Sequence, residues 1–312
     1  MTETVGQRRL SPAALAALET GDDAQRLRVI RRKPFVRHAV IGAIFKRLEE
    51  ALDDYPTEGD SHFLIYGLSG MGKSKAAEFF AERHRRPDDP EAPAAQVPVL
   101  YVSMAGVTSA RGLLLVILHK LGAPYSAGSS AESLYPTVVS LLTRVGVKML
   151  IIDEIHHVAY GNRLERLKVL SVIKGLGNDL KFTIVGFGIP DALRALKWDP
   201  QLERRFEPIR IPRWGRTEET YGFLNSLEMT LPLQKPSLLS QEPVAEWLIE
   251  RSEGLTREIV HLVRKGAIQA IRKGRERIDL PLLKSLKYVP ASERRAEIER
   301  VLKAEGTDRF GG

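Results

Sequence analysis

The stretch Gly67–Ser74, which reads Gly-Leu-Ser-Gly-Met-Gly-Lys-Ser, constrains the fold more than any other part of the chain. It matches G-x-x-x-x-G-K-[ST], the loop that binds phosphate groups in nucleotide triphosphatases. The segment before the loop, residues 62–66, is short and largely apolar, which is typical of a buried parallel strand. Residues 75–83, after it, predict a helix. Strand, glycine loop and helix are the context that the motif requires, which argues against a glycine turn that merely precedes Lys-Ser.

Each part of this loop has a predicted role. The glycines let the backbone curl so that its N–H groups face phosphate oxygens at a helix N-terminus. Lys73 is expected to reach the β- and γ-phosphates, and the Ser74 hydroxyl is expected to ligate Mg²⁺. The residues predicted to bind ATP are Gly67, Ser69, Gly70, Met71, Gly72, Lys73 and Ser74.

A second motif lies at residues 149–154, where an apolar strand ends in Asp153 and Glu154. This is the form of a Walker B motif. We expect a strand beside the phosphate loop to deliver Asp153 to the Mg²⁺ shell, and Glu154 to polarise the attacking water. The alternative is an Asp-Glu pair that only begins a loop. His156 and His157 follow directly, but neighbouring residues diverge in regular elements, so loop or supporting roles are expected rather than a metal site.

Composition sets broad limits. The 312 residues contain no cysteine, which excludes disulfides, thiolate metal sites and cysteine nucleophiles. The sequence contains no apolar run long enough for a membrane span and no apolar N-terminal segment typical of a secretory signal. We therefore expect a cytoplasmic protein without a membrane partner. The formal net charge of +8 favours a polyanionic partner, although charge alone does not establish one.

The pattern along the chain predicts an α/β fold with a three-layer core around a parallel sheet and a small C-terminal helical lid. Five strands are expected, at 62–66, 97–104, 148–154, 181–186 and 207–212. Core helices are expected at 36–52, 75–83, 109–121, 131–145 and 162–177, and lid helices at 217–228, 242–251, 256–273 and 280–286. In the helix at 162–177, one face is expected to carry Leu164, Leu167, Val169, Leu170 and Ile173. The predicted divisions are a basic arm at 1–35, the core at 36–213, the lid at 214–288 and a tail at 289–312.

The N-terminal arm permits two interpretations. Residues 1–23 lack strong periodicity and predict a mobile segment. Residues 24–38 contain six Lys or Arg and no acidic residue. This basic run is either a solvated lead into a helix or an arm that contacts DNA or docks on a partner protein.

These motifs together resemble an AAA+ ATPase, and several further runs resemble the TniB family of transposition regulators. The runs are Leu150–His157, Gly188–Ala192, Asp199–Phe206 and Ile211–Trp214. The resemblance extends over about residues 25 to 275. It implies an ATPase that uses ATP and Mg²⁺, assembles on double-stranded DNA as a hexameric ring or helical filament, and recruits a DDE transposase, with a target-selection factor as a further partner.

The resemblance also assigns residues outside the two motifs. Arg204 or Arg205 lies where AAA+ proteins hold an arginine finger, which stabilises γ-phosphate charge in the neighbouring subunit. Arg257 is similar to a sensor-2 arginine. One departure is the end of the fourth strand, which reads Val-Gly-Phe-Gly where a polar sensor-1 residue is usual; Thr183 lies in the wrong position for that role. Slow hydrolysis would follow.

DNA contacts are the least determined part of the site. The candidates are Thr108, Arg111, Arg163, Arg166 and Lys168, together with residues 251–287, which hold ten Lys or Arg against four Asp or Glu. Each position taken singly is also compatible with a solvated helix face. Alternative functions are a replication-type helicase loader or initiator, a protein-binding secretion or signalling module, and a scaffold that binds nucleotide without turnover.

Overall fold

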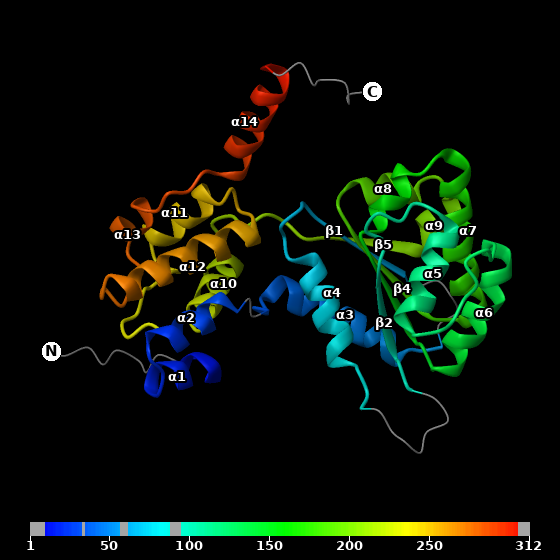
Figure 1. The fold of residues 1–312 in the computed structure, drawn as a ribbon, viewed down its shortest axis with the longest axis horizontal. Coiled ribbons are helices and arrows are strands. Elements are labelled where there is room, and N and C mark those ends of the chain that lie inside the picture. The colour runs from blue at the N-terminus through cyan, green and yellow to red at the C-terminus, as the bar shows by residue number, and fades with distance from the viewer. Residues whose placement is uncertain (1–9, 33–34, 57–61, 88–94, 305–312) are drawn as a thin grey trace. The chain divides into compact units, whose positions relative to one another are not determined.

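The computed structural model describes residues 10–32, 35–56, 62–87 and 95–304. The chain forms two compact units. The sheet unit comprises Val40–Pro212, and the helical unit comprises Met1–Ala39 with Arg213–Gly312 (Figure 1). Among the described helices, none combines the length and the apolar composition that crossing a bilayer requires.

The sheet unit is built on five parallel strands in the order β2-β3-β4-β1-β5. Their bounds are β1 His62–Tyr66, β2 Val99–Ser103, β3 Met149–Asp153, β4 Thr183–Gly188 and β5 Phe206–Arg210. All five were predicted from the sequence; β1 has the predicted bounds, and the ends of the other four differ by one or two residues. β3 is buried at every position, as expected for a strand covered on both faces.

One row of paired residues crosses the whole sheet. Val102 pairs with Ile152, Ile152 with Gly186, Gly186 with Leu64, and Leu64 with Pro208. The register places the carboxyl ends of β1 and β3 at the same edge of the sheet, with β4 between them.

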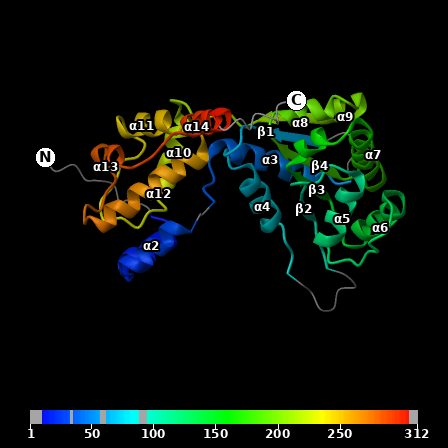
Figure 2. The same cartoon turned by 45° about the horizontal axis from the view of Figure 1, so that its top comes forward.

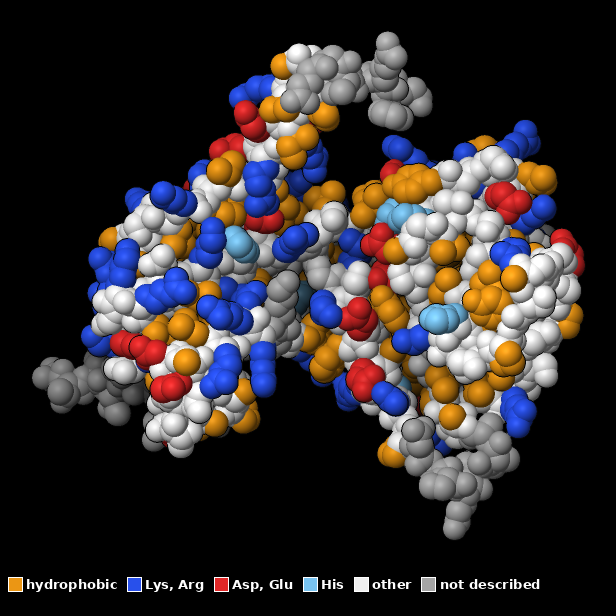
Figure 3. Space-filling view, viewed as in Figure 1, with side chains coloured by type: hydrophobic (Ala, Val, Ile, Leu, Met, Phe, Trp, Pro, Cys, Tyr) orange, Lys and Arg blue, Asp and Glu red, His pale blue; other side chains and the backbone are white. Residues whose placement is uncertain are grey.

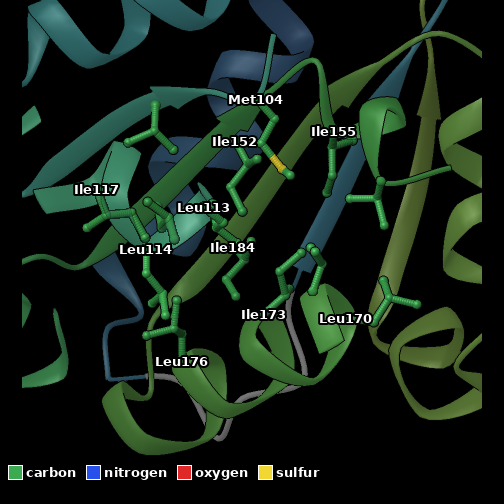
Figure 4. Close-up of a cluster of buried hydrophobic side chains, with 14 of the residues drawn as sticks. Met104, Leu113, Leu114, Ile117, Ile152, Ile155, Leu170, Ile173, Leu176 and Ile184 are labelled. Atoms are coloured by element: carbon green, nitrogen blue, oxygen red, sulfur yellow. The ribbon is translucent and has the colours of Figure 1, made fainter. Parts of the chain in front are cut away.

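Helices cover both faces of the sheet (Figures 1 and 2). The helices of this unit are α3 Ala39–Asp53, α4 Lys73–Arg83, α5 Ala110–Lys120, α6 Ala131–Arg144, α7 Arg163–Leu180, α8 Asp191–Leu196 and α9 Pro200–Arg205, with a 3-10 turn at Ile155–Tyr160. α4 packs against β2, β3 and β4, while α5, α6 and α7 enclose the larger core on the other face. Figure 4 shows Leu113, Ile117 and Ile173 of these helices meeting Ile152 and Ile184 of the sheet.

The predicted apolar face of α7 is only partly correct. Val169, Leu170 and Ile173 are buried as expected. Leu164 is 61% exposed and Leu167 39%, because both lie in the first turns of the helix, on the side away from the core. The buried stripe continues instead to Leu176.

The helical unit contains the lid helices that the periodicity predicted. They are α10 Glu218–Glu228, α11 Val244–Arg251, α12 Thr256–Arg272 and α13 Leu280–Lys284, followed by α14 Ala291–Ala304. α12 lies at the centre of this unit, since its apolar stripe of Ile259, Leu262 and Val263 is fully buried.

Residues 10–23 lie in the segment that was expected to be mobile, but they are largely helical, and together with residues 24–32 of the basic run they belong to the helical unit. They form α1 Pro12–Glu19 and α2 Asp23–Arg31, which pack onto the helical unit. Arg26 is only 4% exposed; its Nε donates to the carbonyl of Pro232 at 2.9 Å, and its guanidinium pairs with Glu276. Arg264 donates to the backbone carbonyls of Ile30 and Arg31. Ion pairing and helix capping therefore hold this segment on the helical unit, and composition alone does not reveal such contacts. Arg28, Arg31 and Arg32 remain exposed.

A cluster of aromatic rings lies around His38 in the same unit. The ring of Trp214 stacks on Phe223 with centroids 4.6 Å apart, and His38 contacts the edge of that stack at 4.7 Å from Trp214. His38 is buried, and its Nδ1 has no hydrogen-bond partner among the described residues. Burial lowers the pKa of His38 to about 4, because the charged imidazolium is poorly solvated there.

This pKa predicts a pH-dependent loss of stability. In the unfolded chain His38 should titrate near the ordinary value of 6.5, so below that pH the unfolded state takes up a proton that the folded state refuses. The free energy of unfolding should therefore fall by roughly 3 kcal/mol between pH 6.5 and pH 4, on the basis of ~1.4 kcal/mol per pH unit. Denaturant titrations over this range, compared between the wild type and His38→Phe, measure the contribution. An unchanged slope in the variant would assign the pH dependence to other groups, whereas the exposed His119→Gln should leave the slope as it is.

Candidate nucleotide-binding site

The phosphate loop connects β1 to α4. Gly70 and Gly72 have φ angles of 82° and 86°, in the left-handed region that glycine adopts without steric cost. Gly72 also precedes the first turn of α4 without a side-chain cap, so the N–H groups of that turn face the loop. At Gly67 a Cβ atom would lie 2.8 Å from the carbonyl oxygen of Ile211, so only glycine fits beside the chain leaving β5. The loop therefore has the backbone that phosphate binding requires.

Lys73 is buried at the centre of this loop, with 7% of its surface exposed. Its Nζ donates to the carbonyls of Gly67 at 2.9 Å and Leu68 at 2.7 Å. Burial lowers the pKa of Lys73, and the nearby carboxylates of Asp153 and Glu154 partly offset this effect. The ammonium group is thus held inside the loop, where it interacts with both acids of the second motif.

The carboxylate of Asp153 stands at the end of β3, a strand that is not the direct neighbour of β1. β4 is inserted between them, and the two strands still deliver their ends to one edge of the sheet because all strands are parallel. Asp153 is 2% exposed. Its Oδ2 accepts a hydrogen bond from the hydroxyl of Tyr101 at 3.0 Å, and its Oδ1 accepts one from the Glu154 N–H at 2.8 Å.

Glu154 adopts a left-handed conformation, with φ at 56°. This turn directs its carboxylate toward the two histidines that follow, whose Nε2 atoms both lie 3.5 Å from Oε2 of Glu154. The expectation that His156 and His157 diverge is wrong, because the 3-10 turn at Ile155–Tyr160 brings their rings to 4.9 Å from each other. Burial lowers the pKa of His156.

The end of β4 explains the missing polar sensor-1 residue. Thr183 begins β4, far from the edge where the motifs meet. At the other end, a Cβ on Gly188 would lie 2.9 Å from Cβ of Ala192 and 3.3 Å from Cγ2 of Ile155. Packing of the 3-10 turn and α8 against β4 leaves no room there for a side chain.

The residues present fit a magnesium–nucleotide complex. Asp153 offers a buried carboxylate and Ser74 a half-buried hydroxyl, and oxygen donors of this kind are the ligands that Mg²⁺ prefers. The buried ammonium of Lys73 and the glycine backbone supply the positive and N–H groups that a triphosphate needs. Ser69 and Met71 complete the loop; Met71 is 1% exposed, so it contributes backbone rather than side-chain contact.

The two candidate finger residues differ in their surroundings. Arg205 donates to Oδ1 of Asn178 at 2.6 Å and is half-buried at the end of α9. Arg204 is exposed, and within the described parts of the chain it has no hydrogen-bond or ion-pair partner. Of the pair, Arg204 is therefore the residue available to another molecule. Arg257, at the start of α12, is exposed and belongs to the helical unit, so its sensor-2 role stays a prediction.

The DNA candidates Thr108 and Arg163 lie near each other. A Cβ on Gly161 would be 2.8 Å from the Thr108 carbonyl oxygen, so the loop after β2 packs directly on the turn that begins α7. Arg163 is exposed at this place. Figure 3 shows further Lys and Arg side chains spread over the visible face of the helical unit.

Intrachain contacts hold the other three DNA candidates. Arg111 donates to the carbonyls of Ser129 and Ala127, which anchors the loop between α5 and α6. Arg166 donates to Gly161 at 2.7 Å, and its guanidinium lies 5.0 Å from the ring centre of Trp198. Lys168 pairs with Glu165 at 3.4 Å across one helical turn. Arg111 and Arg166 therefore have structural roles that the sequence did not indicate.

The sequence did not predict the contact of Tyr101 with Asp153, nor the contact of His157 with Glu154. Tyr101 lies two positions before the end of β2, and only the pairing of β2 with β3 shows that its hydroxyl reaches Asp153. Burial and the Asp153 carboxylate both raise the pKa of Tyr101, which keeps the hydroxyl protonated as a donor.

Comparison with solved structures agrees with this architecture. The chain is similar to the ORC2 protein of Aeropyrum pernix in ADPNP–ADP complexes, with a TM-score of 0.61 and 17% identity over 82% of this chain and 70% of that chain. It is similar to the Aeropyrum pernix ORC1 protein in complex with DNA, with a TM-score of 0.60 and 22% identity over 88% and 69%. It is also similar to Cdc6p from Pyrobaculum aerophilum, with a TM-score of 0.58 and 15% identity over 82% of this chain and 68% of that chain. At these identities the likeness concerns the fold, which is the α/β P-loop fold of AAA+ ATPases, as predicted.

The family resemblance is confirmed for the whole of the sheet unit and for its flanks. A family model described as bacterial TniB protein matches residues 26–216. The match ends before α10, so it does not extend to the lid helices that the sequence resemblance included. Because it covers more than half of the chain, this protein belongs to the TniB family.

Proposed function

We propose that this protein is an ATP-dependent regulator of DNA transposition. The observation that carries the proposal is the meeting of the glycine loop, Lys73, Asp153 and Glu154 at one edge of the sheet in a member of the TniB family. Lys73 and the loop backbone would bind the triphosphate, and Ser74 with Asp153 would hold Mg²⁺, which neutralises phosphate charge. Glu154 would take the proton of the attacking water.

Assembly between subunits is the second part of the proposal. Arg204 has no partner among the residues that the structure describes, and it projects from the short helix before β5. As an arginine finger it would complete the nucleotide site of a neighbouring subunit. ATP binding and self-association would then favour each other, since each raises the population of the state that the other needs.

Double-stranded DNA is the proposed surface for this assembly. The net charge of +8 and the exposed Arg163 beside Thr108 support contact with the phosphate backbone without sequence readout. The assembly would mark a target for a DDE transposase, with a target-selection factor as a further partner, and hydrolysis would disassemble it. The replication-initiator alternative shares the fold of the ORC proteins, so the fold does not separate the two; family membership favours transposition.

Electron microscopy tests the assembly. The purified protein with a non-hydrolysable ATP analogue and duplex DNA should form rings or filaments, and neither ligand alone should suffice. Lys73→Ala should weaken nucleotide binding by about 100-fold or more, because it removes a buried cation worth roughly 3 kcal/mol in charged hydrogen bonds. It should abolish assembly with it. Full filaments from Lys73→Ala would contradict the coupling, and monomers under all conditions would favour the protein-binding alternative.

Glu154→Gln tests the role of the general base. The amide keeps the shape of the side chain but cannot accept the water proton, so turnover should fall by about 100-fold or more while ATP binding is retained. Steady-state phosphate release and DNA-bound assembly are measured together, and a long-lived ATP-bound assembly is expected. Rapid disassembly at the wild-type rate would show that another group activates the water.

Arg204→Ala and Arg205→Ala form a matched pair. Loss of the finger should lower phosphate release by about 1000-fold without changing the affinity of an isolated subunit for ATP. Loss of Arg205 should affect turnover little, because that side chain bonds Asn178 within its own chain. Mixing Arg204→Ala with Glu154→Gln subunits should restore partial activity, since one kind of interface then holds both intact groups. Equal defects in the two arginine variants would remove the basis for assigning the finger to Arg204.

A further inference from the structure

The imidazole of His157 lies between the loop after β2 and the carboxylate of Glu154. Its Nδ1 accepts a hydrogen bond from the Gly106 N–H at 3.1 Å, in the loop after β2. Its Nε2 lies 3.5 Å from Oε2 of Glu154. His157 is thus the one side chain in this part of the described structure that contacts both that loop and the Glu154 carboxylate.

The contact with Gly106 fixes which ring nitrogen carries the proton. A backbone N–H can only donate, so Nδ1 must offer its lone pair. In the neutral ring the proton therefore resides on Nε2, the nitrogen that faces Glu154. The 3.5 Å separation is longer than a typical hydrogen bond, but contacts of catalytic groups commonly shorten when the substrate is bound.

The same proton position argues against a metal ion at this cluster. Glu154, His156 and His157 offer three ligand atoms within 4.8 Å of one another, which is a spacing suited to a divalent cation. A metal on Nε2 of His157 would need the lone pair there and would move the proton to Nδ1, where it would oppose the Gly106 N–H. The hydrogen-bonded arrangement therefore satisfies the ring, and metal ligation through His157 would break it.

We propose that His157 is a positioning residue for Glu154. Its Nε2–H donates to the Glu154 carboxylate, and its Nδ1 makes the orientation of that carboxylate depend on the loop after β2. The inference rests on the proposed function, since it assigns a role in the hydrolysis that Glu154 promotes. His156 also lies 3.5 Å from the Glu154 carboxylate through its Nε2, but its Nδ1 is buried without a partner in the described structure, so its ring does not link Glu154 to the loop after β2.

The loop after β2 is joined to the site at a second point. The Met104 N–H donates to the Asp153 carbonyl at 2.9 Å, directly before the turn that contains Gly106. Beyond Gly106, Thr108 packs against Gly161 at the other end of the 3-10 turn. A ligand that displaces this loop would move the Gly106 N–H, release Nδ1 and so change the direction in which Nε2 holds Glu154. Occupancy of the loop by DNA or a partner would thereby alter turnover without touching the nucleotide.

Two substitutions separate the two nitrogens of the ring. In His157→Asn the amide can reach Gly106 in place of Nδ1 but falls short of Glu154. In His157→Gln the amide NH₂ reaches the position of Nε2 and keeps a donor for Glu154. We expect kcat for ATP to fall by about 10- to 100-fold in His157→Asn, as for a displaced catalytic group, and by a clearly smaller factor in His157→Gln, which keeps the donor to Glu154 but loses the link to Gly106. Affinity for an ATP analogue should stay within about 2-fold of the wild type in both, and the exposed His119→Gln serves as the control.

Losses of equal size in the two variants, or a parallel loss of analogue binding, would overturn the proposal and leave His157 a packing role. A nitrogen-15 NMR spectrum of histidine-labelled protein, assigned with His157→Gln, supplies a readout that does not need activity. A proton on Nδ1 of His157 would contradict the arrangement even if the wild type hydrolysed no ATP, in which case the proposed function would fail separately. Stoichiometric Zn²⁺ binding that disappears in His157→Gln would assign the cluster to a metal instead.

Discussion

The placement of β4 between β1 and β3 is the constraint on which the site depends. Gly186 pairs with Leu64 on one side and with Ile152 on the other, so the phosphate loop and Asp153 leave the sheet almost level with each other. Parallel pairing makes this possible, because every strand presents its carboxyl end at the same edge. The small residues of β4 follow from the same arrangement. A Cβ at Gly186 would lie 3.0 Å from Cδ1 of Ile155, and a Cβ at Gly188 would lie 2.9 Å from Cβ of Ala192, so packing at the end of the strand favours glycine at both positions.

Charge is concentrated at that edge with little access to water, and the buried charges of Lys73 and Asp153 are satisfied within the protein. Lys73 donates to carbonyls of its own loop, and Asp153 accepts from Tyr101 and from the Glu154 N–H. Burying such groups without partners would cost several kcal/mol, on the order of 1–3 for each hydrogen bond left unmade. A triphosphate that enters the loop must therefore compete with internal acceptors for Lys73.

Residues 10–32 come before the sheet unit in the chain but belong to the helical unit, so they are not a free arm. α2 is held by Arg26 and Glu276, and Arg264 of α12 caps its last carbonyls. The TniB match begins at residue 26, so it includes the buried arginine of this contact as well as the sheet unit. Arg28 and Arg31 of the same helix, and Arg32 directly after it, remain exposed. Because the helix already restricts their backbone, a contact made there would lose less conformational entropy than one made by a mobile segment.

Local pattern by itself determined the phosphate loop, Asp153 and Glu154 at the end of β3, the five strands and the AAA+ class, because each of these is encoded by contiguous residues with a strong period or motif. The tertiary structure decided what depends on neighbours distant in sequence. Strand order placed β4, and not β1, beside β3. Packing against the core turned Leu164 and Leu167 outward, and bonds to remote carbonyls occupied Arg111. The roles of Tyr101 and His157 arise from residues about 50 positions away, at Asp153 and Gly106, through pairing and a turn that no local pattern records.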